Sequence, residues 1–500
     1  MGSITYVNAS FLTFESLLTL PTLGGMTWPK PFLDRMKTQL GDQSVDFLAA
    51  LEQPAPVSIR LNPRKVKGTL PYDRIPWTEH GYYLPRRPIF TLDPWWHAGA
   101  YYVQEASSML LEQAVKQHVE PKENFVAVDL CGAPGGKSTH LASLLSEDSL
   151  LISNEVIRQR AHILSENLQK WGSPQTIVTQ NNPGDFAQKE AWVDLLVVDA
   201  PCSGEGLFRR DPKAAEEWSP SAQEHCVMRQ RDILEAVWPA LKPGGWLIYS
   251  TCTFFPGENE KNLQWLSRQH DVHSLALELP VDWGITEVEV AGIRGYYCLP
   301  HLVKGEGFFL SILQKQGEDA PMGKSKKKRG GKQAFWEKAS QGDWDFTREW
   351  VNNVDREQLR KVDDQLILVP QAPEELLDWL GRSLNWLHFG VEVGEVKKKN
   401  VKLAPGLALS CLATDNLDQD IELSYEDSLR YLSRENLSMN DSGKGWVRVG
   451  YEGVLLGHGK RVNTRINNYF PEFWKIRMNW QVREEEYFSL TKNVIHPESP

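Results

Sequence analysis

Between about 120 and 315, the chain alternates short apolar runs with longer stretches whose apolar residues recur at helical spacing. Short apolar runs bounded by turn signals are typical of buried parallel strands. We therefore predict five strands, over Phe125–Leu130, Leu150–Asn154, Thr176–Thr179, Leu195–Asp199 and Trp246–Ser250. With the helices between them and a closing antiparallel pair, Gly295–Leu299 and Gly307–Leu313, they predict a doubly wound α/β sheet of the Rossmann-like kind.

The segments on either side of this α/β region have different patterns. From about 26 to 115, helical patches alternate with turn signals and include a short predicted strand that begins at Ile59, which indicates an α+β region. A helix is predicted over Ser221–Leu241, ended by a Pro-Gly-Gly stop. From about 385 to 476, glycine turns separate short predicted strands over Trp446–Tyr451, Gly453–Gly457 and Gly459–Val462. This part is predicted to be a small β-rich module.

The composition is that of a globular chain. Hydrophobic residues make up 41% and charged residues 24% of the 500 positions, and this length exceeds a single ordinary core. No apolar run approaches the roughly 20 residues that a membrane-spanning helix needs. We therefore expect about two to four domains and no membrane span.

The net charge of −10 argues only weakly against a nucleic-acid partner, because basic residues need to cluster on only one face. Two clusters would attract phosphates: Lys324, Lys326, Lys327, Lys328, Arg329 and Lys332 in the first, and Lys397, Lys398, Lys399 and Lys402 in the second. A solvated linker and a solvated turn are the plainer interpretations of the two clusters, and the phosphate-binding interpretation stays open.

The six cysteines lack the paired spacing of a metal site, so no metal is expected. Cys131, Cys202 and Cys252 follow predicted strands. The other three are expected to be small core residues: Cys226, Cys298 and Cys411. Thiols that must stay reactive favour a reducing, cytoplasmic compartment.

A glycine-rich loop, Cys131–Lys137, follows the strand that ends at Asp129. Its three glycines allow a backbone to approach a bound ligand closely. A nucleoside-triphosphate loop needs Gly-x-x-x-x-Gly-Lys-Ser/Thr, and here Gly132 and Gly136 are one residue too close. An ATPase is therefore a minor alternative, and the loop indicates another ligand.

Acidic residues follow the next two predicted strands. Glu155 stands where an acid can accept both ribose hydroxyls of a nucleoside, although an acid is also favoured there by the helix dipole. After the third strand, Asp185 could accept from an adenine amino group, with Asn181 and Asn182 as rivals. The pattern favours a nucleoside-containing cofactor.

Two cysteines each follow an apolar strand. The first lies in the segment from Asp199 to Gly204, as Asp-Ala-Pro-Cys202-Ser-Gly, and the second in Ser-Thr-Cys252-Thr. Because the carboxyl ends of neighbouring parallel strands meet at one sheet edge, both thiols could serve one carbon centre. One could attack as a nucleophile and the other could help release the product. Considered alone, each cysteine is better explained as a small buried hydrophobic residue.

Together, these three segments resemble the RNA (cytosine-5) methyltransferase family. The resemblance implies S-adenosylmethionine as methyl donor, Cys252 as the nucleophile that attacks cytosine, Cys202 as the residue that resolves the adduct, and Asp199 as the group that holds the ring. It also implies a set of cofactor-binding residues: Cys131, Gly132, Ala133, Pro134, Gly135, Gly136, Lys137, Glu155, Asp185 and Asp199.

The resemblance extends into both flanks. Arg60 and Gln104 match family segments that brace the core, and Phe208, Arg209 and Arg210 could contact flanking nucleotides or be solvated loop residues. The tail is similar to a bacterial branch that carries a PUA-like RNA-binding module and methylates a cytosine in 16S ribosomal RNA. This implies 16S ribosomal RNA as partner, within the small ribosomal subunit, and a monomeric enzyme. A transfer-RNA methyltransferase and a non-catalytic RNA-binding assembly factor are the alternatives.

These patterns divide the chain into seven parts. They are a disordered or wrongly included extension (1–25), an N-terminal RNA-facing region (26–118), the methyltransferase domain (119–315), a basic linker (316–332), an intermediate region (333–384), the PUA-like domain (385–476) and a tail (477–500).

Overall fold

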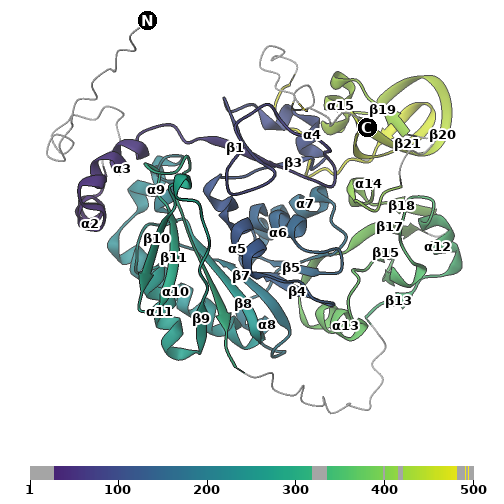
Figure 1. Ribbon diagram of the computed structural model, residues 1–500. Coiled ribbons are helices and arrows are strands. Elements are labelled where there is room, and N and C mark those ends of the chain that lie inside the picture. Colours follow the sequence, from purple (N-terminus) through teal and green to yellow (C-terminus); the bar gives the residue numbers. More distant parts are fainter. Residues whose placement is uncertain are drawn as a thin grey trace, which may run out of the picture.

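The computed structural model describes residues 28–317, 335–397, 400–414 and 420–480, together with Leu490 and Val494. The predicted extension 1–25 and the lysine cluster at 324–332 lie outside these residues. A ten-stranded sheet forms the centre of the molecule (Figure 1), in the order β10-β11-β12-β8-β7-β4-β5-β6-β16, with β9 beside β12. Its strands are β4 Val126–Asp129, β5 Leu150–Asn154, β6 Thr176–Thr179, β7 Val193–Asp199, β8 Leu241–Thr251, β9 Val272–Ser274, β10 Thr286–Val290, β11 Ile293–Cys298, β12 Phe308–Lys315 and β16 Trp386–Phe389.

Helices cover both faces of this sheet because alternate residues of its strands point to opposite sides. On β4, Val126 and Val128 belong to the core that includes Leu234 of α10, whereas Ala127 belongs to the core that includes Leu141 of α6. The first face is covered by α8 Pro183–Phe186, α10 Pro220–Val237 and α11 Glu260–Gln269. The second is covered by α5 Leu111–His118, α6 Gly136–Leu144 and α7 Arg158–Trp171.

The predicted doubly wound parallel sheet is confirmed. Strands β4 to β8 pair in parallel, and β11 and β12 close the sheet as an antiparallel pair, as expected. Two boundaries differ. Helix α10 ends at Val237 and a short 3-10 turn follows it, whereas β8 begins at Leu241, which pairs with Val193. The Pro-Gly-Gly stop therefore lies inside the irregular start of β8, where the register between β7 and β8 shifts.

The N-terminal region packs directly on the central α/β domain. It comprises α2 Lys30–Leu40, α3 Ser44–Leu51 and a small sheet in the order β2-β1-β3, with β2 Gly81–Leu84, β1 Val57–Leu61 and β3 Tyr101–Val103. Phe32 of α2 lies in the same hydrophobic core as Trp218 and the sheet residue Val198. This region is therefore part of the structure that shapes the carboxyl edge of the sheet.

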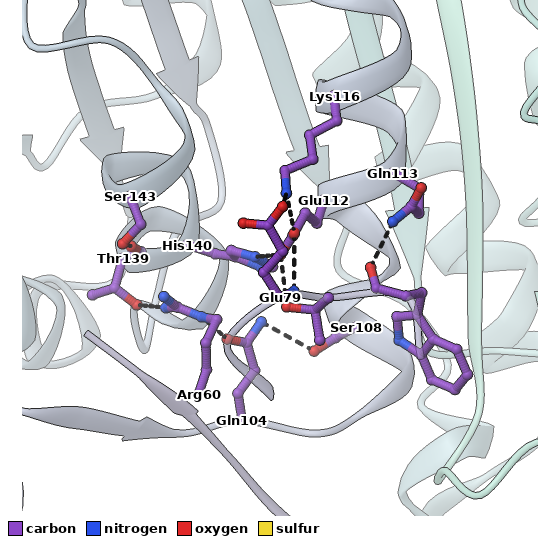
Figure 2. A network of polar contacts seen from close by, with 12 residues as sticks. Arg60, Glu79, Gln104, Ser108, Glu112, Gln113, Lys116, Thr139, His140 and Ser143 are labelled. Carbon is purple, nitrogen blue, oxygen red and sulfur yellow. Dashed lines mark hydrogen bonds and ion pairs between the residues drawn. The ribbon is translucent and has the colours of Figure 1, made fainter. Parts of the chain in front are cut away.

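A buried polar network joins the N-terminal region to α5 and α6 (Figure 2). Arg60 of β1 donates to Gln104 at 2.9 Å and to Thr139 of α6 at 2.7 Å. Glu112 of α5 accepts from His140 at 3.0 Å. A buried guanidinium or carboxylate without such partners would be costly, so the network favours one docking geometry of these elements.

The C-terminal part begins with a second sheet, in the order β13-β14-β15-β17-β18. Its strands are β13 Glu337–Lys338, β14 Leu359–Val362, β15 Gln365–Leu368, β17 Val391–Lys397 and β18 Asn400–Leu403, flanked by α12 Gln341–Thr347 and α13 Glu374–Ser383. Strand β16 lies between α13 and β17 in the chain but does not join this sheet. It pairs antiparallel with β6 of the central sheet. The boundary predicted between the intermediate region (333–384) and the PUA-like domain (385–476) therefore falls inside the part of the chain that forms this second sheet.

A long hairpin dominates the last part of the described chain. Strands β20 Leu437–Tyr451 and β21 Val454–Asn468 pair antiparallel, and β19 Asp420–Glu422 pairs parallel to β20. The two residues between the strands, Glu452 and Gly453, both have positive φ, as a two-residue hairpin turn requires. The two short strands predicted over 453–462 are thus one strand. Helices α14 Pro405–Leu409 and α15 Tyr425–Leu432 pack beside it.

The hairpin and the N-terminal sheet share one hydrophobic core. Ile59 and Tyr101 pack in the same cluster as Tyr431, Val449 and Ile466, and Figure 1 shows the yellow C-terminal elements beside α4 (Pro94–His97) and β3. The last module is thereby fixed against the N-terminal region. Among the described residues, no helix is long and apolar enough to cross a membrane.

Candidate active site

Strands β7 and β8 bring two thiols together at the carboxyl edge of the sheet. Their parallel register pairs Asp199 with Ser250, so both chains leave the sheet side by side. Cys202 and Cys252 follow, and their Sγ atoms lie 3.0 Å apart. Both cysteines are free and half-buried. A carbon atom placed above this pair would be within reach of either sulfur.

The two thiols differ in their surroundings. The Cys202 sulfur also accepts from the Cys252 backbone N–H at 3.3 Å. The hydrogen bond with the Cys252 thiol, together with burial, raises the pKa of Cys202 well above its ordinary value. Cys202 is therefore held as a neutral thiol while Cys252 is beside it, which suits a role other than the first attack.

A buried carboxylate fixes the loop that carries Cys202. Glu258 is fully buried and accepts from the Ser203 backbone N–H at 3.0 Å, from the Ser203 hydroxyl at 2.5 Å and from Gln230 at 2.9 Å. Burial raises the pKa of Glu258 to about 7. Because three donors meet one carboxylate, the residue after Cys202 has little freedom to move.

A second buried carboxylate, Glu205, joins this loop to the Cys252 loop and to α2. It accepts from the Phe254 backbone N–H at 3.0 Å and from the Thr253 hydroxyl at 3.1 Å, and it forms an ion pair with Arg35. Our sequence analysis missed both Glu205 and Glu258. The available signal was their position, since each acid follows one of the two cysteines within a few residues.

Asp199 lies beside the thiols and is paired with a residue of the glycine-rich loop. Its carboxylate lies 2.9 Å from the Lys137 ammonium and accepts from the Ser250 hydroxyl at 2.7 Å. Burial alone would lower the pKa of Lys137, but the nearby Asp199, Asp129 and Cys252 outweigh it, and the pKa is raised. Lys137 is thus a fixed positive charge between the two loops.

The glycine-rich loop fits a ligand with a cationic or amine-bearing end. Asp129 is fully buried; one of its oxygens accepts from Ser138 at 2.6 Å, and the other has no partner among the described atoms. A Cβ on Gly132 would lie 2.7 Å from the Ser138 hydroxyl, so a larger residue would crowd this site. An unpaired buried acceptor of this kind suits the charged methionine end of S-adenosylmethionine.

Glu155 directly follows the end of β5, as predicted from the strand pattern. Its side chain is 4% exposed, accepts from the Ile157 backbone N–H at 2.9 Å and lies 3.2 Å from Arg160. It is therefore a buried carboxylate beside the glycine-rich loop, because the β4–β5 register pairs Asp129 with Ser153, two residues before Glu155. Its proposed hydrogen bonds to ribose stay a prediction.

The position of Asp185 bears on the adenine contact. Asp185 accepts from the Asn182 backbone N–H at 2.9 Å, in a capping box at the start of α8. Asn181 donates to the Asn385 carbonyl at 3.1 Å, which links it to the segment before β16. Of the three rivals, Asn181 is committed to that contact, whereas the Asn182 side chain is exposed. Asp185 remains our choice.

Three residues differ from the sequence-based interpretation: Phe208, Cys411 and also Cys226, which is only partly buried and not a core residue. Phe208 is 0% exposed and packs against Trp28 and Phe32, so it is neither a solvated loop residue nor available to RNA. Cys411 is exposed and is not a core residue. The local pattern of Phe208 was uninformative, because its burial depends on helix α2, which lies far away in sequence.

Three family models match successive parts of the chain. They are the N-terminal domain of 16S rRNA methyltransferase RsmF (28–106), the 16S rRNA methyltransferase RsmB/F model (116–314) and the methyltransferase RsmF PUA domain (418–476). The PUA match covers β19 to β21, so the expectation of a PUA-like module is confirmed.

Whole-chain relatives give the same picture. The chain is 30% identical to the ribosomal RNA small subunit methyltransferase F of Aeromonas salmonicida, over 85% of this chain and 92% of that protein. It is 28% identical to the protein of the same name from Vibrio campbellii, over 89% and 96%. Among solved structures, PH0851 aligns with a TM-score of 0.51 and 26% identity, over 58% of this chain and 66% of that one.

Proposed function

The chain belongs to the RsmF-type 16S rRNA methyltransferases, which depend on S-adenosylmethionine, and from this premise we propose that it methylates carbon 5 of a cytosine in 16S ribosomal RNA. The observation that carries the choice of carbon 5 is the 3.0 Å separation of the Cys202 and Cys252 sulfur atoms. Methylation of an amine or hydroxyl needs no thiol, whereas carbon 5 of cytosine needs covalent activation.

Cys252 is the nucleophile in this proposal. Its thiolate adds to carbon 6, and the electron pair of the C5–C6 double bond moves toward carbon 5 and the ring, where nitrogen 3 takes a proton from solvent and returns it when the double bond reforms. Carbon 5 is then nucleophilic enough to take a methyl group. When bound, S-adenosylmethionine supplies that methyl group as an electrophile on its sulfonium sulfur. The Lys137 ammonium, held by Asp199, is a positive charge near this thiol.

Cys202 acts in the release. After methyl transfer, carbon 5 still carries its hydrogen; a base removes that proton, the C5–C6 double bond reforms and the Cys252 thiolate departs. Adduct formation takes the Cys252 thiol out of its hydrogen bond with Cys202, which is the largest cause of the raised pKa of Cys202. Cys202 is therefore easier to ionise in the adduct than in the free enzyme, as a base for this step requires.

Asp199 holds the ring. Its carboxylate lies at the same edge as the thiols and accepts from Ser250 and Lys137. We assign it the contact with the exocyclic amine or the protonated ring nitrogen of cytosine. Since carboxylates accept from cytosine amines, this contact would select cytosine over uracil. The cytosine must leave its stack to reach this edge.

The arrangement of the domains supports an RNA-facing role for both flanking regions. The PUA module and the N-terminal region share one hydrophobic core, so they would present one continuous surface to the substrate. We propose the assembled small subunit as substrate, a monomeric enzyme and a cytoplasmic location, where the thiols stay reduced. Residues 26–118, 119–315 and 385–476 would be the RNA-facing region, the methyltransferase domain and the PUA-like domain.

Labelled methyl transfer followed by nucleoside analysis tests this function. Purified enzyme, S-adenosyl-[methyl-³H]methionine and unmodified 16S ribosomal RNA or small subunits should yield labelled 5-methylcytidine, and Cys252→Ala should yield none. Label confined to transfer RNA would replace the proposed substrate. Label in another nucleoside would refute cytosine-5 chemistry, and no label on any RNA would favour the assembly-factor alternative.

A further inference from the structure

A basic groove runs between the N-terminal region and the catalytic domain. It has a volume of about 970 Å³. Proline and aliphatic residues form part of its wall, including Pro54, Pro56, Val57 and Pro300. Its cationic side chains come from three separate segments of the chain: Arg86 and Arg87 after β2, Arg209 and Arg210 after the Cys202 loop, and Lys304 before β12.

The charge of this groove contrasts with that of the whole chain. Five basic residues and a single acidic one, Glu306, are among its lining residues, whereas the chain as a whole carries a net charge of −10. Burial raises the pKa of Glu306 to about 7, and its carboxylate lies 3.7 Å from Arg210. Such a concentration of cations on one wall of an acidic protein indicates an anionic partner.

One of the five cations is structural. The other four are exposed, although Lys304 lies 3.7 Å from Asp73 and 4.3 Å from the Tyr83 ring centroid. Arg209 is half-buried, and its guanidinium donates to the carbonyls of Gly305, Gln53 and Pro54, at 2.6, 3.1 and 2.9 Å. It therefore holds the two walls of the groove together. The other four side chains are exposed: Arg86, Arg87, Arg210 and Lys304.

One residue, Gly206, contacts both the groove wall and the loop that carries Cys252. Gly206 lies between the groove wall and the Cys252 loop: its N–H donates to the Cys252 carbonyl at 2.8 Å, and a Cβ on it would meet the Gly307 carbonyl at 2.8 Å. The groove wall at 304–307 and the Cys252 loop are thus in contact with the same glycine. The groove wall therefore lies one packed residue away from the Cys252 loop.

We propose that this groove binds the single-stranded RNA segment next to the target cytosine. In this assignment, which rests on the proposed function, Arg86, Arg87, Arg210 and Lys304 contact successive backbone phosphates, and the proline-rich wall contacts sugars and bases. Backbone contacts of this kind fix the register of a strand without reading its sequence. The groove would therefore position the target nucleotide over Cys252 rather than select it.

Salt-dependent RNA binding tests the groove directly. The full chain would be titrated into a short fluorescent single-stranded oligoribonucleotide over a series of salt concentrations. Each lost phosphate contact should lower the slope of log affinity against log salt by about 0.7. Arg86→Ala/Arg87→Ala and Arg210→Ala/Lys304→Ala should each lose up to about 1.4 in slope. Arg209 is left unchanged, because its loss would open the groove.

Lys122→Ala/Lys189→Ala provides the matched control. Both lysines are exposed and precede β4 and β7, at the opposite edge of the sheet from the thiols. This control should bind RNA with the wild-type slope, and all variants should melt at the wild-type temperature. Wild-type slopes in both groove variants would overturn the inference. An equal salt-dependent loss of binding to polyglutamate would assign the groove to an acidic polypeptide and overturn it as well.

The result is separable from the proposed function. If wild-type enzyme makes 5-methylcytidine and the groove variants keep the wild-type slope, only the groove assignment fails. If the labelled product is another nucleoside, the proposed function fails whatever the slopes are.

Discussion

The Lys137 ammonium lies 2.9 Å from the Asp199 carboxylate and joins the glycine-rich loop to the strand end that precedes Cys202. Lys137 also lies over the Phe308 ring, 4.8 Å from its centroid, so its position is fixed from two sides. The pair thus couples the expected cofactor loop to the expected cytosine site. The Lys137 side chain therefore affects the charge and the geometry of both the cofactor loop and the cytosine site.

Replacing Lys137 should therefore impair catalysis more than folding. Lys137→Met keeps much of the side-chain volume but removes the charge beside Asp199 and Cys252. A misplaced reacting group can lower the rate about 100-fold, and we expect a loss of that order in single-turnover methyl transfer. Lys137→Arg, which retains the charge, should lose less. Equal rates for wild type and Lys137→Met, at matched melting temperatures, would contradict this role.

Glu258 should act through the position of Cys202. Glu258→Ala removes the acceptor of the Ser203 N–H and one of the two partners of the Ser203 hydroxyl and of the Gln230 amide nitrogen, and an unsatisfied buried polar group costs about 1–3 kcal/mol. We expect a lower free energy of unfolding in urea and a slower release step. Glu258→Gln keeps one acceptor oxygen and should be milder in both respects. Product release at the wild-type rate in Glu258→Ala would show that Glu258 does not act through the position of Cys202.

The Arg35–Glu205 ion pair should stabilise the N-terminal docking. Glu205 is 0% exposed, and removing its counter-ion by Arg35→Met should cost about 3 kcal/mol of unfolding free energy. Lys30→Met is the matched control on the same helix, because Lys30 and Asp34 form an exposed pair worth about 0.5 kcal/mol or less. The double variant Arg35→Met/Glu205→Gln should be more stable than Arg35→Met alone. Similar losses for Arg35→Met and Lys30→Met would refute the buried pair.

Acid should destabilise the polar network of Figure 2 through His140. Burial and the neighbouring Arg60 lower the pKa of His140 to about 4 from 6.5. Between these values the unfolded chain binds a proton that the folded chain does not, so the free energy of unfolding falls as pH falls. One such group contributes at most about 1.4 kcal/mol per pH unit.

His140→Gln isolates this contribution. The difference between the wild-type and variant unfolding free energies should shrink as pH falls from 6.5 toward 4, because only the wild type loses stability through this group. A difference that stays constant over that window would show that His140 does not titrate there.

The central sheet could be predicted because its strands are buried on both faces. The predicted ranges Leu150–Asn154 and Thr176–Thr179 coincide with β5 and β6, since a continuous apolar run bounded by polar residues leaves little choice of boundary. The meeting of Cys202 and Cys252 at one edge followed from the same pattern, because parallel strands deliver their carboxyl ends together.

Other features had no local signal. The first half of β20 is largely exposed on both faces, so residues from Leu437 to Gly443 show no alternation, and the hairpin was predicted too short. Strand β16 adds to β6 from more than two hundred residues away in sequence, and Lys137 meets Asp199 only through the fold. Phe208 is buried by α2, which ends more than 160 residues before it in sequence.

Covalent trapping tests the central claim most directly. Cys202→Ala, incubated with S-adenosylmethionine and the RNA substrate and analysed on a denaturing gel, should accumulate a protein–RNA complex, because Cys252 still attacks carbon 6 and the release is slowed. Cys252→Ala and the double variant should show no complex. A complex in Cys252→Ala, or methylation by Cys252→Ala at the wild-type rate, would contradict the account.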